Sequence, residues 1–211
     1  MYNPAHFQLN DPEALHALMA QYPLATLVTT SAHRLNVTHL PLLHDRAHGV
    51  LRGHMAKPNP QWSDLSSDAR ALAIFTGPQH YISPNWYPSK SEHGKAVPTW
   101  NYVVVHAEGL LRIVHDPHWL RQNVSELTAA QEAAFPNPWK VDDAPSGFID
   151  SMLNAIVGVE ITIETLEGKC KASQNRPEAD RIGVIAGLRQ LRTPEADRMA
   201  EIVSSANRRE K

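Results

Sequence analysis

The sequence predicts a mainly β fold, an antiparallel barrel with helices at its periphery and its C-terminal end. About six short segments rich in β-branched and apolar residues are separated by turn signals. These segments do not alternate regularly with helices, as they would in a parallel βαβ sheet. The 211 residues and 42% hydrophobic content are enough for a sizeable core. We expect one domain over residues 1–211 with a helical extension at about 177–211.

The N-terminal half is expected to contain one helix followed by strands. Asp11 before Pro12 is a favourable helix start, and apolar residues on one face predict an amphipathic helix over 11–21. Strands are expected at 24–30, 36–43, 50–55 and 71–76, with a turn at 31–34 and a short helix opening at Asn59-Pro60. Because proline fixes φ and removes a backbone donor, the proline-rich segment 77–98 is expected to be an ordered loop.

The C-terminal half is expected to alternate strands and helices. A strand at 102–114, interrupted at Glu108-Gly109, leads into a helix over 117–133 that Asp116 caps. The remaining elements are a loop at 135–146, a short helix at 147–156, a half-exposed strand at 157–166, and terminal helices at 177–191 and 194–207. The sequence contains no internal repeat.

Charge and cysteine content narrow the function classes. The net charge of −2 gives no global attraction to nucleic acid, although it leaves room for a local basic patch. Cys170 is the single cysteine, so no disulfide forms within the chain and a reducing compartment is expected. No signal-peptide pattern and no apolar run of membrane-spanning length occur. We expect a cytoplasmic protein without a membrane partner.

Two segments of the first half are candidates for a ligand site. His39 lies on the opposite strand face from Thr38 and Leu40, and Pro41 favours a sheet edge where a planar ligand could meet main-chain amides. The alternative is a histidine on a strand surface. Lys57 precedes Asn59 and a helix start, and free helical N–H groups beside a lysine favour an anion. The alternative there is an ordinary capped helix with a solvated lysine.

Two further segments combine polar and aromatic residues. The segment 81–102 holds five aromatic residues, interleaved with lysines, hydroxyls and an amide, which suits a planar anionic partner. The alternative is a proline-rich loop held by aromatic packing. The segment 169–177 places two lysines, an arginine and three polar side chains between a strand and a helix, where they could close over a phosphate or a ring. The alternative is a solvated turn.

Metal and nucleophile signatures are absent from the sequence. The twelve histidines are scattered without a zinc-ligand spacing, and the pair His44 and His48 lies in a turn, so we expect no metal site. There is no G-x-S-x-G motif, and Cys170 has basic neighbours but no evident base. No catalytic residue is assigned.

Three motifs resemble those of the PaiB family of FMN-binding negative transcriptional regulators. They are Tyr81-Ile-Ser-Pro-Asn-Trp-Tyr with Gly94-Lys-Ala-Val-Pro-Thr-Trp-Asn-Tyr102, then Gly168-Lys-Cys-Lys-Ala-Ser-Gln-Asn-Arg-Pro177, and the opening Met1-Tyr-Asn-Pro-Ala-His-Phe. The resemblance covers nearly the whole chain. Cys170 departs from it, since an aromatic or bulky apolar residue is expected at that position.

The resemblance implies a split β-barrel, related to pyridoxamine-phosphate oxidases and flavin reductases. It implies a homodimer with FMN bound non-covalently at the interface. The implied ring contacts come from the strand around His39–Pro41, and the phosphate contacts from Lys57 and Asn59. The full set of implied cofactor-binding residues is His39, Leu40, Pro41, Lys57, Asn59, Tyr81, Trp86, Thr99, Asn101, Lys171, Gln174 and Asn175.

Three functions remain open. The family implies a repressor of transcription, yet residues 189–211 carry six basic and four acidic residues, which makes only a modest case for promoter DNA. A flavin-dependent oxidoreductase, a reductase or an oxidase, needs the protein only to position FMN. The third function is a sensor that binds FMN or a related metabolite and signals to a partner protein.

Overall fold

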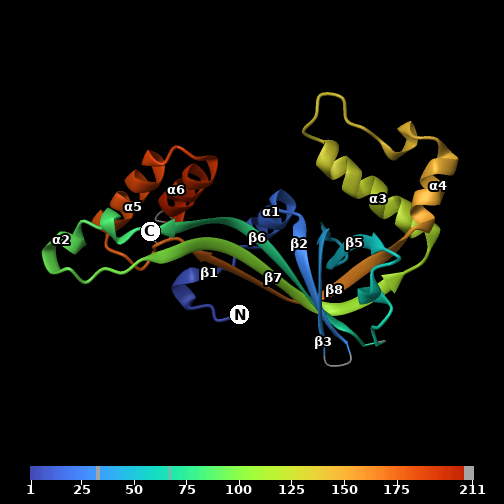
Figure 1. Ribbon diagram of the computed structural model, residues 1–211, viewed down its shortest axis with the longest axis horizontal. Coiled ribbons are helices and arrows are strands. Elements are labelled where there is room, and N and C mark those ends of the chain that lie inside the picture. Colours follow the sequence, from blue (N-terminus) through green and yellow to red (C-terminus); the bar gives the residue numbers. More distant parts are fainter. Residues whose placement is uncertain (32–33, 67, 207–211) are drawn as a thin grey trace. The chain divides into compact units, whose positions relative to one another are not determined.

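A computed structural model describes residues 1–31, 34–66 and 68–206. The chain forms two compact units, drawn in Figure 1. Unit 1 comprises Met1–Leu15, Thr76–Val105 and Glu167–Lys211, and unit 2 comprises His16–Phe75 and His106–Leu166. Three long strands contribute residues to both units. The expectation of one domain with a helical extension at about 177–211 stays a prediction.

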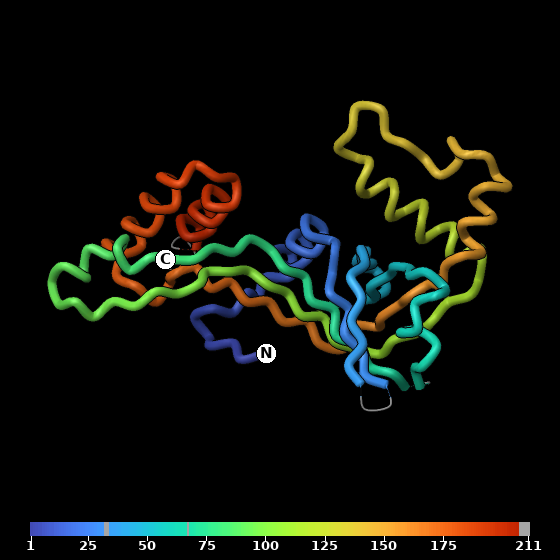
Figure 2. Tube along the Cα trace, in the orientation of Figure 1, coloured from blue at the N-terminus to red at the C-terminus, as the bar shows by residue number. Residues whose placement is uncertain are grey.

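The predicted antiparallel fold is confirmed, because the described residues form one sheet of eight strands. The strands are β1 (Gln8–Leu9), β2 (Leu24–Ser31), β3 (Arg34–Pro41), β4 (Leu43–Asp45), β5 (Val50–Ala56), β6 (Arg70–Ile82), β7 (Thr99–Val114) and β8 (Ile156–Lys171). Their order is β3-β2-β6-β7-β8-β5-β4, and β1 pairs with β8. The strand β3 therefore lies at one end of the order, and the hairpin that it forms with β2 can be followed in Figure 2.

Six α-helices lie among the described residues. They are α1 (Pro12–Gln21), α2 (Ser89–His93), α3 (Pro117–Glu132), α4 (Ser146–Asn154), α5 (Glu178–Gln190) and α6 (Pro194–Ala206). The predicted cap of α3 is present, since the carboxylate of Asp116 accepts a hydrogen bond from the backbone N–H of His118 at 2.9 Å. The described residues also form four short 3₁₀ helices, of which η2 (Pro60–Trp62) and η3 (Pro84–Trp86) concern the site.

The proline-rich segment differs from its prediction as a loop. The strand β6 continues through Pro78 to Ile82, and the short helix α2 follows. The register between β2 and β6 ends at Ile74, so the missing N–H of Pro78 removes no bond to β2. The predicted interruption of the next strand is wrong as well, because β7 runs unbroken through Gly109.

Two predicted features reach residues outside the described part of the chain. The expected turn at 31–34 includes residues 32–33, and the last residue of the helix expected at 194–207 is also outside it. Within the described residues, β2 extends to Ser31 and β3 begins at Arg34. The strands β1 and β4 were not predicted, because two or three residues are too short for a periodic pattern.

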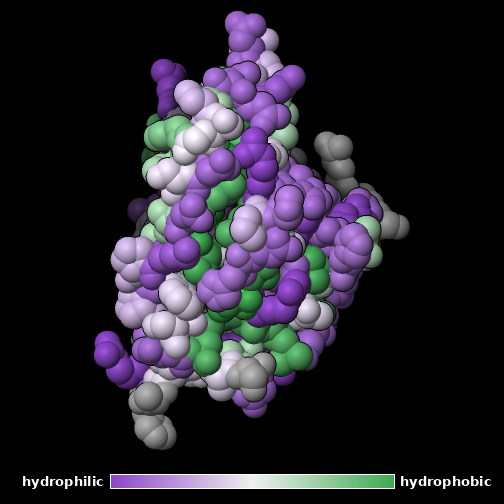
Figure 3. All heavy atoms as spheres, turned by 90° about the vertical axis from the view of Figure 1, so that its right-hand side faces the viewer, coloured by the Kyte–Doolittle hydropathy of each residue, from purple (hydrophilic) through white to green (hydrophobic). Residues whose placement is uncertain are grey.

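Each unit has buried apolar residues of its own. In unit 2 the side chains of Leu27, Leu51, Phe75 and Ile161 are fully buried. In unit 1 a cluster formed by the end of β6, η3, α5 and α6 buries Ile82, Tyr87, Val184, Leu188 and Met199, among others. Figure 3 shows apolar side chains gathered between hydrophilic ones on the face drawn there. In the described residues no helix is long and apolar enough to cross a membrane.

Candidate functional site

A chain of polar side chains joins η2 to the edge strand β3 in unit 2. Asn59 caps η2 by accepting a hydrogen bond from the backbone N–H of Gln61 at 2.9 Å. Its Nδ2 also donates to Oγ1 of Thr38 at 2.8 Å, and that hydroxyl donates onward to Oε1 of Gln61. The result is a closed set of three side chains that fixes η2 against β3.

Gln61 anchors this set in the core, since it is only 2% exposed. Its Nε2 donates to Oγ1 of Thr29 at 3.0 Å and to the carbonyl oxygen of Asn36 at 3.3 Å. A buried amide with all of these partners is stabilising, whereas the loss of one partner would leave a costly unsatisfied group. The backbone around β3 and η2 is thus held rigidly, as a ligand site requires.

The predicted ring-binding segment lies on β3 beside this set. His39 is exposed, and its Nδ1 lies 3.1 Å from Oγ1 of Thr26 on β2. Leu40 is buried and Pro41 is half-buried, so they alternate with His39 as the strand period requires. Because β3 ends the strand order, one of its edges pairs with no other strand of the described residues.

Lys57 lies between β5 and η2. Its side chain is exposed, and its ammonium makes no hydrogen bond or ion pair with the residues that the structure describes. The backbone N–H groups of Lys57 and Asn59 donate to Ala155 and Ala56, both at 2.9 Å. These amides are therefore occupied within the chain, and the ammonium is the group of this segment that an anion can reach.

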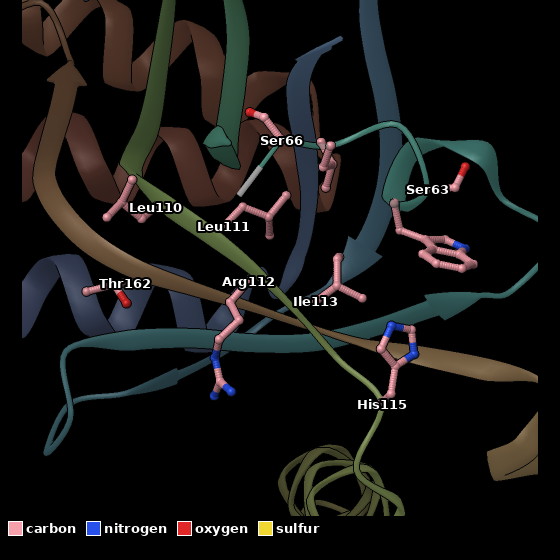
Figure 4. Close-up of a pocket in the computed structure, with 10 residues that line it drawn as sticks. Ser63, Ser66, Leu110, Leu111, Arg112, Ile113, His115 and Thr162 are labelled. Atoms are coloured by element: carbon pink, nitrogen blue, oxygen red, sulfur yellow. The ribbon is translucent and has the colours of Figure 1, made fainter. Parts of the chain in front are cut away.

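Trp62, the last residue of η2, borders a pocket of about 520 Å³ in unit 2. The pocket is lined by Trp62, Ser63, Leu65, Ser66, Leu110, Leu111, Arg112, Ile113, His115 and Thr162 (Figure 4). The rings of Trp62 and His115 meet edge to face with their centroids 5.6 Å apart. Trp62 is held in place by a 2.8 Å hydrogen bond from Nε1 to the carbonyl oxygen of Lys57. The volume is in the usual range for a small-molecule site.

The two faces of β7 carry different kinds of side chain near this pocket. Leu111 and Ile113 point to one side of the strand and Arg112 to the other (Figure 4). The guanidinium of Arg112 is bound to the Glu160 carboxylate, with its Nη2 2.7 Å from Oε1. The pocket therefore offers apolar and aromatic walls with the His115 imidazole, and its arginine charge is already paired.

Predicted site residues of unit 1 form a second polar group where β7 meets β8. The Lys171 ammonium donates to the Thr99 hydroxyl, and burial, the largest cause, lowers the pKa of Lys171. Asn101 is fully buried and donates from Nδ2 to Oγ of Ser173 at 2.9 Å. Its Oδ1 has no partner among the described residues, so a water or ligand donor is needed there.

The remaining predicted residues of unit 1 have different surroundings. Tyr81 is 43% exposed and meets the ring of Trp100 edge to face, with centroids 6.3 Å apart. The indole of Trp86 packs on α5, where a Cβ at Gly187 would lie 2.4 Å from its ring. The side chain of Gln174 binds the backbone of its own turn, accepting from Ala172 N–H at 2.7 Å. Asn175 is exposed at that turn, two residues after Ser173, which has a φ of +62°.

The structure thus groups the predicted residues into two sets. Five of them belong to unit 2, namely His39, Leu40, Pro41, Lys57 and Asn59, and the other seven to unit 1. Their roles toward a cofactor stay predictions. The pocket residues Ile113 and His115 were missed. Ile113 is half-buried near the end of β7 and His115 is exposed directly after the strand, so neither continues the buried alternation of β7 that a sequence pattern could reveal.

Comparison with known proteins identifies the family. Residues 1–165 match the model of the family described as "Putative FMN-binding domain". The chain is 33% identical over 205 residues to the Protease synthase and sporulation protein PAI 2 of Bacillus subtilis, and the match covers 96% of each chain. The protein belongs to this FMN-binding family, of the PaiB type, and the predicted cofactor, FMN, is confirmed by the family match.

Solved structures confirm the fold class. A conserved hypothetical protein from Mycobacterium tuberculosis superimposes with a TM-score of 0.60 at 14% identity, covering 84% of this chain and 95% of the other. An FAD and heme binding protein from Mycobacterium smegmatis gives a TM-score of 0.55 at 15% identity, covering 78% and 73%. The fold is a split β-barrel with helical additions.

Proposed function

We propose that this protein binds FMN non-covalently and acts in the cytoplasm as a negative regulator of transcription. The observation that carries the proposal is the sequence match to the B. subtilis relative over nearly the full length of both chains. The name of that relative refers to a protease synthase and to sporulation. The single cysteine, Cys170, is in keeping with a reducing compartment.

The groups around β3 and η2 fit FMN. A phosphate needs a cation, and the exposed Lys57 ammonium has no partner among the described residues. An isoalloxazine ring needs a flat surface with polar edges, and the segment His39–Pro41 belongs to the strand that ends the strand order and carries an exposed imidazole. Unit 1, taken by itself, holds the buried Oδ1 of Asn101, which has no partner among the described residues and is left to accept a hydrogen bond. Bound FMN supplies electron and hydride transfer, and the protein supplies its position.

We propose further that the protein is a homodimer with FMN at the interface. Leu35 is 71% exposed, Val37 is 54% exposed and Leu24 on β2 is 65% exposed. The register pairs Leu24 with Pro41, and Val28 with Val37, so these side chains share one face of the sheet. An apolar sheet face of this kind is typical of a protein–protein interface.

The dimer is tested by sedimentation velocity of wild type and Val37→Lys. A lysine on the apolar face is expected to shift the protein to monomer, whereas Leu191→Lys, at an exposed apolar residue after α5, leaves the dimer intact. A monomeric wild type contradicts the proposal.

Contact with promoter DNA has limited support in the helices. In unit 1 the helices α5 and α6 are joined by three residues, a length that suits a helix-turn-helix pair. The first turn of α6 carries Glu195 and Asp197, however, and acidic side chains there oppose DNA phosphates. Regulation through a partner protein is therefore a second route for the same function.

A flavin-dependent oxidoreductase is the alternative function. The observation that favours it is the pocket beside η2, because its aromatic and apolar walls could hold a small organic substrate. His115 is the titratable group whose ring lines this pocket together with Trp62.

The absorbance spectrum of the purified full-length chain, followed by two assays, tests these functions. We expect a flavin spectrum that survives dialysis after FMN is added, no turnover of NAD(P)H, and a shift of promoter DNA that weakens steeply with salt. Turnover of NAD(P)H with flavin bound would support the oxidoreductase instead. A colourless protein after FMN addition and dialysis would overturn both functions.

A further inference from the structure

Two histidines from distant parts of the sequence face each other in unit 2. His16 lies on α1 and His44 on β4, and their Nδ1 atoms are 3.2 Å apart. The ring centroids are 5.3 Å apart with an angle of 55° between the rings. Both side chains are half-buried, so the pair is partly shielded from bulk water.

The pair borders a small enclosed cavity of about 130 Å³. The cavity is lined by His16, Ala20, Pro23, Leu42, Leu43, His44, Leu127, Ala130 and Gln131. Apart from the two imidazoles, Gln131 is the polar side chain among these lining residues. The cavity is large enough for an ion with a water molecule, and its apolar walls give them no competing partner.

The distance between the nitrogens matches two ligands of one ion. With Zn–N bonds of about 2.0–2.1 Å, nitrogens 3.2 Å apart subtend an angle of roughly 100° at the metal, close to tetrahedral. We propose that His16 and His44 bind a zinc ion through their Nδ1 atoms. Water completes the coordination, and the Gln131 amide is in the same cavity to bind that water or the ion.

The tautomer of each ring decides whether both nitrogens can face one ion. A neutral imidazole presents the lone pair that a metal requires, and each ring keeps its hydrogen on Nε2 when Nδ1 binds. The two Nδ1 atoms, which face each other, can then both bind the same ion.

A hydrogen bond between the two imidazoles is the competing explanation of the 3.2 Å distance between the Nδ1 atoms. One ring would then carry a hydrogen on Nδ1 and donate it to the lone pair of the other ring. No group of three or more His, Cys, Asp or Glu side chains suited to a metal occurs in the described part of the chain, so the site would rest on two protein nitrogens. The two explanations differ in a measurable way, because the hydrogen bond needs no ion.

The experiment uses the full chain without an affinity tag, treated with chelator and then titrated with zinc against a chromogenic competitor. We expect one zinc per chain in the wild type, and an affinity weaker by about tenfold or more in His16→Gln and in His44→Gln. His48→Gln is the matched control, since His48 is 76% exposed and bonded to Asp45 in the same hairpin. Its affinity for zinc is expected to equal that of the wild type.

Cobalt binding to the unmodified wild type provides a second readout that does not depend on how the variants fold. Tetrahedral coordination by two imidazoles is expected to give intense visible absorption with one equivalent of cobalt, which zinc then displaces. The proposal is overturned if the wild type binds neither ion. It is also overturned if both glutamine variants bind zinc as tightly as the wild type, or if His48→Gln weakens binding equally.

Discussion

Nδ2 of Asn59 donates a hydrogen bond to Oγ1 of Thr38 over 2.8 Å, joining residues that lie 21 positions apart. The same Asn59 side chain caps η2 through its Oδ1. One residue thus sets both the start of η2 and its attachment to the edge strand. Lys57 precedes this junction and His39 follows Thr38, so the junction fixes the spacing of the two predicted FMN contacts.

Replacing Asn59 with alanine is therefore expected to lower both stability and FMN affinity. The loss of the cap and of the bond to Thr38 should reduce the free energy of unfolding by about 1–2 kcal/mol. Urea unfolding measures the stability, and quenching of FMN fluorescence measures the affinity. Asn10→Ala, at an exposed residue near the N-terminus, is the control and should change neither. An unchanged FMN affinity in Asn59→Ala would separate the junction from the flavin site.

Lys57→Ala is expected to weaken FMN binding more than Lys90→Ala. If the Lys57 ammonium binds the phosphate, its loss costs roughly tenfold to a hundredfold in dissociation constant, as for a hydrogen bond to a charged group. Lys90 already donates to Oδ1 of Asn85 at 2.6 Å, and it serves as a lysine of similar exposure. Titration of both variants with FMN and with riboflavin tests the assignment, because riboflavin lacks the phosphate. Equal losses in the two variants would refute it.

Local signals were enough to predict much of the fold. Asp116 and Pro117 marked the start of α3, because a cap and a fixed φ act within a few residues. The segment 77–98 could not be predicted in the same way. There η3 is held by the packing of Trp86 on Gly183 and Gly187 of α5, about a hundred positions later in the sequence. A contact over such a separation leaves no periodic pattern in the segment itself.

The candidate site shows the same limit. Lys57 and Asn59 could be singled out because they lie beside a helix start. The role of Gln61 was invisible, since its partners Thr29 and Thr38 are on other strands. The expected anion site relied on free backbone N–H groups at this helix start. The backbone N–H of Asn59 is not free, because it donates to the carbonyl oxygen of Ala56. Only tertiary structure shows which donors are occupied.

Gly109→Ala is expected to be strongly destabilising. A Cβ at this position would lie 1.8 Å from the carbonyl oxygen of Thr162 on β8, which is backbone and cannot move aside without breaking the sheet. We expect a loss of roughly 3 kcal/mol or more in the free energy of unfolding. Gly147→Ala is the matched control, because a Cβ there meets nothing within 4 Å. In the helix α4 that change should stabilise by about 0.5–1 kcal/mol. Similar denaturation midpoints for the two variants would contradict the close approach of β7 and β8.

The half-buried histidine His54 is expected to make the stability of the fold depend on pH. Burial lowers the pKa of His54 below its ordinary value of 6.5, and its Nδ1 has no partner among the described residues. The unfolded chain therefore takes up a proton at a higher pH than the folded chain does. The contribution of the neutral His54 to the free energy of unfolding is fully present above pH 6.5. It is lost progressively as the pH falls from 6.5 toward the pKa of His54 in the folded chain.

Urea midpoints measured above and below pH 6.5 test this dependence. The loss of stability on acidification should be smaller in His54→Gln than in the wild type, because glutamine does not titrate. His118→Gln is the control, since His118 is exposed at the start of α3 and its replacement should leave the wild-type dependence in place. Part of the pH dependence is expected to remain in His54→Gln, because burial also lowers the pKa of His44. If His54→Gln and His118→Gln lose stability in parallel with the wild type, the partial burial of His54 does not govern the response to acid.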